Sequence, residues 1–179
     1  MPGPITTLSC ACGQFAMTLT GEPIISAACH CKSCAEGSKR LEALPTSAPM
    51  RSTDGSTPYV LYRKDRVQFP NGTALLAQFY LTPQSPTRRV VTTCCQTPVF
   101  VEFKNGHWLS LYASLWRGHA VPPLEIRTMT SDQPEGVAVP DDVPSGRMTT
   151  LGFYGRLLAA WAAMGFKTPA INIEKRVEA

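Results

Sequence analysis

The sequence predicts a mainly β protein: a small β-sheet fold with metal sites, followed by a C-terminal helix. Three observations support this. Apolar and polar residues alternate in several short stretches, 16 prolines and 13 glycines favour turns and short strands, and the cysteines are grouped at short spacings. A chain of 179 residues buries roughly 70% of its surface on folding, so it does not need a metal merely because it is small.

Period-two alternation locates the predicted strands. It is clearest in residues 12–23, where Phe15, Met17 and Leu19 share one face before a Gly-Glu-Pro turn. The other regions expected to contain strands are 23–28, 58–72, 73–83, 88–103 and 107–116. The second of these should hold two short strands around a charged turn and end in an Asn-Gly hairpin turn. Regular spacing of short strands favours a sandwich or barrel-like sheet.

The C-terminal third differs in composition. Residues 124–146 are polar and proline-rich, which predicts an irregular surface segment. Residues 152–169 should form a helix that ends at Gly165 and Pro169. Its apolar residues fall at helical spacing: Tyr154, Leu157, Leu158, Trp161 and Met164. We therefore divide the chain into a metal-binding β domain (1–125) and a C-terminal part (126–179), whose helix packs on the domain or at a homodimer interface.

Charge and hydropathy argue against several classes of partner. The net charge is +4, and the cations are scattered singly or in pairs, so we expect no nucleic-acid partner. The first ten residues lack the charged and apolar segments of a signal peptide. No apolar run approaches the ~20 residues that a membrane span needs. We therefore expect a cytoplasmic protein with reduced thiols and no membrane partner.

Seven cysteines carry the strongest signal. Cys-x-Cys occurs at Cys10/Cys12 and at Cys29/Cys31, and Cys31 and Cys34 form a Cys-x-x-Cys. In an extended segment, residues two apart point to the same side, so each Cys-x-Cys presents two sulfurs to one point. In a reducing compartment, soft ligands at these spacings favour zinc.

Other interpretations of the CHCKSC segment remain. Free cysteines are often buried as small apolar residues, although core packing gives no reason for three within six residues. A redox Cys-x-x-Cys would open a crossover helix after a strand, and residues 35–49 are too short and broken to make a convincing one. His30 lies on the opposite pleat from Cys29 and Cys31, so we do not expect it to bind the same metal.

Four blocks of sequence occur in an order that resembles a known family: 8–23 with its CxCG, CHCKSC at 29–34, 58–72, and 94–103. Together they resemble the glutathione-dependent formaldehyde-activating enzyme family, also called centromere-protein-V-like, over about the first 125 residues. The resemblance implies an Mss4-like β fold with two zinc sites. It assigns a catalytic zinc to Cys29, Cys31 and Cys34. It assigns a structural zinc to Cys10, Cys12 and the segment around Cys95.

The later part of the structural site departs from the family pattern. Aligned on Thr97-Pro98, Cys95 is the second expected cysteine, but Thr92 stands where the first should be and Cys94 adjoins Cys95. Gln96 replaces a glycine that would tolerate an unusual backbone conformation. Three alternatives follow: a bulge lets Cys94 act as the fourth ligand, the site binds zinc with three sulfurs and another group, or the site is empty.

Three protein sulfurs would leave one position on a zinc ion open, and such a thiolate-rich site suits a substrate thiol better than water activation. A metal-bound thiolate can add to an aldehyde to give a hemithioacetal. Lys32, Lys39 and Arg40 flank this site and could meet the carboxylates of glutathione, although a solvated basic face explains them equally well.

The resulting hypothesis is a zinc-binding protein with one or two ions per chain. It would act as a carbon–sulfur lyase on a thiol–aldehyde adduct similar to S-hydroxymethylglutathione, with glutathione as the small thiol. The alternatives are a non-catalytic zinc-stabilised binding module and a thiol redox sensor.

Overall fold

The computed structural model describes residues 3–45, 49–133 and 136–178. The strands run as follows: β1 (Ile5–Ser9), β2 (Ala16–Thr20), β3 (Ile25–Cys29), β4 (Thr57–Arg63), β5 (Val67–Gln68), β6 (Leu76–Phe79), β7 (Thr87–Thr92), β8 (Pro98–Phe103), β9 (Trp108–Tyr112), β10 (Ile126–Thr128) and β11 (Lys175–Arg176). The helices are α1 (Lys32–Glu42) and α2 (Arg147–Ala163), with 3-10 turns η1 (Lys64–Arg66), η2 (Ala113–Leu115) and η3 (Thr130–Asp132).

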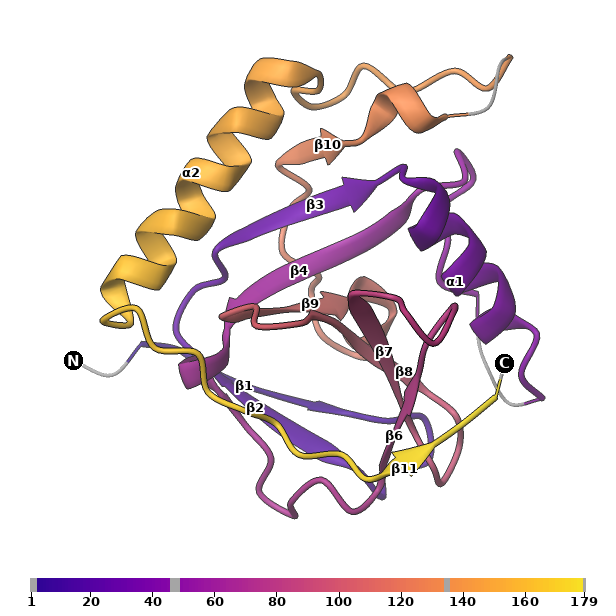
Figure 1. Cartoon of the computed structure of the whole chain (residues 1–179), viewed down its shortest axis with the longest axis vertical. Helices are drawn as coiled ribbons and strands as arrows, with labels where there is room; N and C mark the ends of the chain where they lie inside the picture. Colours follow the sequence, from indigo (N-terminus) through magenta and orange to yellow (C-terminus); the bar gives the residue numbers. More distant parts are fainter. Residues whose placement is uncertain (1–2, 46–48, 134–135, 179) are drawn as a thin grey trace.

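These strands form two sheets (Figure 1). The smaller has the order β1-β2-β5, and the larger has the order β10-β3-β4-β9-β8-β7-β6-β11. Neighbouring strands are antiparallel except at the two edges, where β10 pairs with β3 and β11 pairs with β6 in parallel. The prediction of a mainly β fold with a C-terminal helix is confirmed.

The first hydrophobic core involves the small sheet and one face of the large sheet. Phe15, Met17 and Leu19 are buried, which confirms the face predicted from their alternation. They pack with apolar side chains of the large sheet, among them Val60, Val90, Val99, Phe100, Leu109 and Leu111. Burial of this shared apolar surface stabilises the arrangement of the two sheets.

The second core covers the other face of the large sheet. Its strand residues include Ile25, Ala27, Tyr59, Leu61, Val91, Val101 and Tyr112. Leu41 of α1, Ile126 of β10 and Leu157 of α2 pack against them. Because side chains alternate across a strand, Val90 faces the first core, whereas Arg89 and Val91 lie on the second face.

One local expectation was wrong, and a second was right only in part. The Asn-Gly turn does not join a hairpin, because β5 pairs with β2 while β6 pairs with β7. Residues 35–42 continue a regular helix that begins at Lys32 and has Cys31 at its N-cap. This helix is still not a parallel crossover, because β3 and β4, which flank it, pair antiparallel. Residues 46–48 of the segment judged too broken for a helix lie outside the described residues.

The segment expected to be irregular contains a strand. Ile126, Arg127 and Thr128 are buried and form β10, which lengthens the large sheet beside β3. The alternation was missed because the strand has three residues and carries a buried arginine in its centre. Residues 134 and 135 of the same segment lie outside the described residues.

Helix α2 uses only part of its apolar surface for packing. Leu157 and Met164 are buried, whereas Tyr154 is 57% exposed and Leu158 is 58% exposed. Trp161 stacks on His107, with ring centroids 5.5 Å apart, and His107 Nε2 lies 2.8 Å from the Leu157 carbonyl oxygen. These contacts hold α2 along one side of the molecule (left in Figure 1). Within the described ranges, neither helix has the length and hydropathy to span a membrane.

Candidate metal centres and the adjoining pocket

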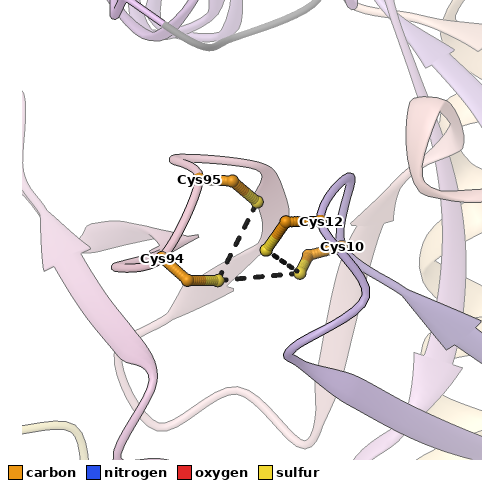
Figure 2. A group of neighbouring side chains, drawn as sticks. All are labelled: Cys10, Cys12, Cys94 and Cys95. Carbon is orange, nitrogen blue, oxygen red and sulfur yellow. Dashed lines mark hydrogen bonds between the residues drawn. The ribbon is translucent and has the colours of Figure 1, made fainter.

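Four cysteines meet where two turns approach each other. Cys10 and Cys12 follow β1, and Cys94 and Cys95 lie in the turn between β7 and β8 (Figure 2). The sulfur of Cys10 lies 3.5 Å from that of Cys12 and 3.6 Å from that of Cys94, and the Cys94 and Cys95 sulfurs are 3.9 Å apart. Four thiolates around a tetrahedral zinc would stand roughly 3.8 Å apart. The donor set therefore fits zinc.

Hydrogen bonds from neighbouring groups fix the two turns. The amide of Phe15 donates to Cys10 Sγ at 3.3 Å, and the amide of Ala11 donates to Thr97 Oγ1 at 3.0 Å, which ties the two turns together. The Thr97 hydroxyl also lies 3.1 Å from Cys95 Sγ. Sequence reasoning used Thr97 only as an alignment marker, yet its side chain links both halves of this cluster.

Thr92 and Cys94 show how the altered sequence is accommodated. Cys94 and Cys95 lie in a turn and not in a strand, so the alternation of a strand does not separate their sulfurs. The β7–β8 register shifts between Val90 and Val91, just before this turn. Thr92 is buried, and its hydroxyl lies 3.4 Å from Cys95 Sγ and accepts the Thr97 amide. The geometry brings Cys94 into a four-sulfur cluster with Cys10, Cys12 and Cys95, and its role as the fourth ligand stays a prediction.

The altered sequence of this turn affects its backbone conformation and the pKa values of its two cysteines. Gln96 has φ of 54°, the left-handed conformation that a glycine at this position would adopt without strain. Burial opposes ionisation of Cys95, but the hydroxyl groups of Thr92 and Thr97 lower its pKa to about 5. Burial raises the pKa of Cys94 to about 12. The site thus stabilises a thiolate at Cys95 even before a metal is considered.

The second cluster stands where β3 ends and α1 begins. Cys29 is the last residue of β3, Cys31 is the N-cap of α1, and Cys34 lies in the first turn of the helix. Their three sulfurs lie within 4.8 Å of one another, and all three residues are half-buried. The Cys34 amide donates to Cys31 Sγ at 3.3 Å, as in other side-chain N-caps. The predicted convergence of these three residues is therefore present in the fold.

The three cysteines of this cluster change one another's pKa values. Hydrogen bonds with Cys29 and Cys34 lower the pKa of Cys31. The hydrogen bond with Cys31 raises the pKa of Cys29, and hydrogen bonds with Cys29 and Cys31 raise that of Cys34. A helix N-terminus also favours a negative charge at Cys31. Three sulfurs at these separations fit three positions of a tetrahedral zinc site.

His30 is a packed histidine on the far side of this segment. It is 3% exposed, and its amide donates to the Thr128 carbonyl of β10 at 3.0 Å. Arg127 Nη1 lies 3.3 Å from His30 Nε2, so this nitrogen accepts, and Nδ1 donates to Gln133 Oε1 at 2.8 Å. Arg127 also contacts Asp54 and Asp142. This network fixes the CHC segment against β10.

A pocket of about 660 Å³ opens beside the three cysteines. Its walls include Leu81, Phe103, Trp108, Met129, Phe153 and Tyr154, together with the three cysteines themselves. Lys32, Lys39 and Arg40, which were expected to flank the site, are not among its lining residues in the described chain. Arg40 instead pairs with Glu36 on the surface of α1.

Arg89 is the cation that faces this pocket. It is 1% exposed, and its Nη2 donates to the Ser33 carbonyl at 2.5 Å. Its Nε and Nη1 have no hydrogen-bond partner among the described residues. Burial raises the pKa of Tyr112 in this region, although the Arg89 charge opposes that shift. The sequence did not predict this role for Arg89, because two adjacent arginines in a strand do not indicate which side chain faces inward.

Comparison with known proteins identifies a family for this chain. The model of the family described as glutathione-dependent formaldehyde-activating enzyme matches residues 5–114, more than half of the 179-residue chain. This range includes both cysteine clusters and ends before α2. No curated protein matches the chain. A crystal structure of a Rhodobacter sphaeroides protein is similar at 12% identity and a TM-score of 0.44, covering 79% of this chain and 100% of that one. The chain belongs to the glutathione-dependent formaldehyde-activating enzyme family.

Proposed function

We propose that this protein is a zinc-dependent carbon–sulfur lyase that acts on thiol–aldehyde adducts at Cys29, Cys31 and Cys34. One observation carries the proposal: three sulfurs converge at a place that borders a pocket of about 660 Å³. Catalytic zinc sites in proteins usually have three protein ligands and an open position, whereas structural sites are closed by four. The cluster of Cys10, Cys12, Cys94 and Cys95 has the composition of the structural kind.

The reaction requires little from the protein beyond charge and position. Zinc held by three thiolates would keep a substrate thiol deprotonated at neutral pH. In the cleavage direction the carbon–sulfur bond of the hemithioacetal breaks, and its electron pair stays on sulfur. The hydroxyl group loses its proton to solvent, and a carbonyl group forms. The network around His30 would hold Cys29 and Cys31 in place during these steps.

Family membership supports this function, and glutathione is the first thiol to test. The chemistry also requires reduced cysteines, which is consistent with the expected cytoplasmic location.

The start of α1 supports a second candidate function. A Cys-x-x-Cys at a helix N-terminus is also the arrangement of thiol redox proteins, so a redox sensor is the alternative that a specific observation supports. A zinc-stabilised binding module would retain both metals and have no activity.

The test combines metal content with bond cleavage. We would measure zinc per chain by elemental analysis on protein purified without chelator, and aldehyde release from the glutathione–formaldehyde adduct. Cys31→Ser should lose one zinc equivalent and all activity while the protein stays folded by circular dichroism. Cys94→Ser is the matched control, since it should lose the other equivalent and keep activity per folded molecule.

Three results would contradict the proposal. If Cys31→Ser unfolds the chain, the roles of the two clusters are reversed. Full zinc occupancy without cleavage of any adduct would favour the binding module. Absence of zinc, together with a reversible Cys31–Cys34 disulfide, would favour the redox sensor.

A further inference from the structure

The walls of the three-cysteine pocket are apolar and partly aromatic. Phe103 and Trp108 of the large sheet lie with ring centroids 5.5 Å apart, and Phe153 and Tyr154 of α2 lie 5.4 Å apart. All four line the pocket. Phe153 and Tyr154 belong to the part of the chain that follows the family-matched residues 5–114. Helix α2, which lies outside the family-matched residues, thus adds an aromatic wall to the cysteine site.

The charges of the pocket do not suit a peptide thiol such as glutathione. Glutathione carries two carboxylates and an ammonium group, and a dry site for it would pair each of them. Among the described lining residues, Arg89 is the one basic side chain and Asp132 is the one acidic side chain. The basic residues of α1 are elsewhere on the surface, so two carboxylates would enter a mainly apolar pocket with one cation.

Arg89 can donate hydrogen bonds to one oxygen atom of a bound adduct. Its guanidinium lies under the first turns of α1, where a Cβ at Gly37 would stand 2.0 Å from Nε. One nitrogen donates to Ser33, which adjoins Cys34 in the sequence, and two nitrogens keep free N–H groups. A buried arginine with no carboxylate partner is costly unless it meets a negative charge. An oxygen that becomes anionic beside the cysteines would supply that charge.

We propose that this site takes adducts of small apolar thiols, aromatic ones above all, with the adduct oxygen placed at Arg89. The inference rests on the proposed function and names its substrate class. The thiol substituent would lie between the rings of Phe153 and Tyr154 and those of Phe103 and Trp108. As the hydroxyl proton leaves and the carbon–sulfur bond breaks, Arg89 N–H groups would hold the developing oxyanion until the carbonyl forms.

Direct binding tests the apolar part of the proposal. Isothermal titration of the zinc-loaded protein with phenylmethanethiol should give a dissociation constant at least tenfold lower than with glutathione. Phe153→Ala should weaken phenylmethanethiol roughly tenfold and leave glutathione within twofold. Leu158→Ala is the matched control, because Leu158 lies on the same helix, is 58% exposed and does not line the pocket.

Kinetics test the role of Arg89. With the phenylmethanethiol–formaldehyde adduct, Arg89→Lys should lower kcat roughly a hundredfold, as loss of an oxyanion donor does in other enzymes. It should leave phenylmethanethiol binding within threefold, because that thiol has no oxygen. Unchanged kcat, or an equal loss of thiol binding, would contradict this role.

The outcomes separate the two proposals. If glutathione binds as tightly as phenylmethanethiol or more tightly, the apolar substrate class is wrong and the lyase proposal stands. If neither thiol binds to the zinc-loaded protein, both are wrong.

Discussion

At the scale of single residues, Cys94 and not residue 92 contributes the fourth sulfur of the cluster. Thr92 occupies the position where the family resemblance led us to expect a cysteine, and its hydroxyl lies 3.4 Å from Cys95 Sγ. Cys94 supplies the remaining sulfur from the turn, 3.6 Å from Cys10. The threonine hydroxyl therefore lies near Cys95 Sγ but would be a poor zinc ligand, and the nearby Cys94 thiol would bind zinc in its place.

A rescue experiment follows from this exchange. Cys94→Ser should lower zinc content by one equivalent per chain, because three sulfurs cannot close a structural site. Adding Thr92→Cys to that variant should restore the lost equivalent, since the new sulfur would stand next to Cys95. Elemental analysis measures both. Thr93→Cys in the Cys94→Ser background is the control, and an equal restoration by it would show that any nearby thiol suffices.

At the scale of elements, α1 lies close against the large sheet because Gly37 has no side chain. A Cβ there would stand 2.0 Å from Arg89 Nε, whereas a Cβ at Gly155 of α2 would meet no described atom within 4 Å beyond its chain neighbours and the nearby backbone of its own helix. The two glycines thus share a helical context and differ in their surroundings.

Alanine at these two positions should act in opposite directions. Gly155→Ala should raise the free energy of unfolding by up to about 1 kcal/mol, through helix propensity alone. Gly37→Ala should lower it by roughly 1–3 kcal/mol, because the buried guanidinium has no room to move away. Urea unfolding measures both variants. If Gly37→Ala is as stable as Gly155→Ala, Arg89 does not pack against α1.

The strand β10 is joined to the cysteine segment by charges as well as by backbone hydrogen bonds. Arg127 bridges Asp54, Asp142 and His30, and Gln133 donates to the Asp54 carbonyl. Burial alone would raise the pKa of Asp54, but hydrogen bonds from Ser56 and the charge of Arg127 lower it overall. The Asp142 pKa is lowered by its hydrogen bond from Arg127.

These lowered pKa values predict an acid-sensitive contribution to stability. The Asp54 carboxylate stabilises the fold fully above its unfolded pKa of about 4, and this contribution is lost as the pH falls through the lower folded value. Asp54→Asn should therefore cost roughly 2–3 kcal/mol at pH 7 and much less at pH 3. Urea unfolding at both pH values measures the difference. Equal costs at pH 7 and pH 3 would mean that the Asp54 charge does not contribute.

Sequence reasoning succeeded where the signal is local. Alternation identified the buried face of Phe15, Met17 and Leu19, and the spacing of Cys29, Cys31 and Cys34 predicted that their sulfurs would meet. It failed where the outcome depends on distant partners. The pairing of β5 with β2, the strand at 126–128 and the inward direction of Arg89 are all set by contacts between segments far apart in the chain.

At the scale of the whole molecule, the two cysteine clusters have different relations to the fold. The four-sulfur cluster joins a turn of the small sheet to a turn of the large sheet, beside the first core. The three-sulfur cluster lies at the start of one helix on the second face, beside a pocket. Zinc in the first would therefore hold two sheets together, whereas zinc in the second would hold one local segment. Assembly into a homodimer stays a prediction.

Cysteine variants in the two clusters should thus differ in thermal stability. Cys12→Ser should lower the melting temperature by at least about 10 °C, because the loss of zinc leaves mainly the Ala11–Thr97 hydrogen bond between the β1–β2 turn and the β7–β8 turn, and each kcal/mol corresponds to about 2–4 °C in a chain of this size. Cys31→Ser should lower it by no more than about 4 °C, since the His30 network and the packing of Leu41 still hold α1. Scanning calorimetry of the zinc-loaded variants measures both.

Excess chelator is the control. Added to the wild-type protein, it should lower the melting temperature as much as Cys12→Ser does, and added to Cys12→Ser it should cause little further change. A larger shift for Cys31→Ser than for Cys12→Ser would mean that the three-sulfur cluster, and not the four-sulfur one, holds the fold together.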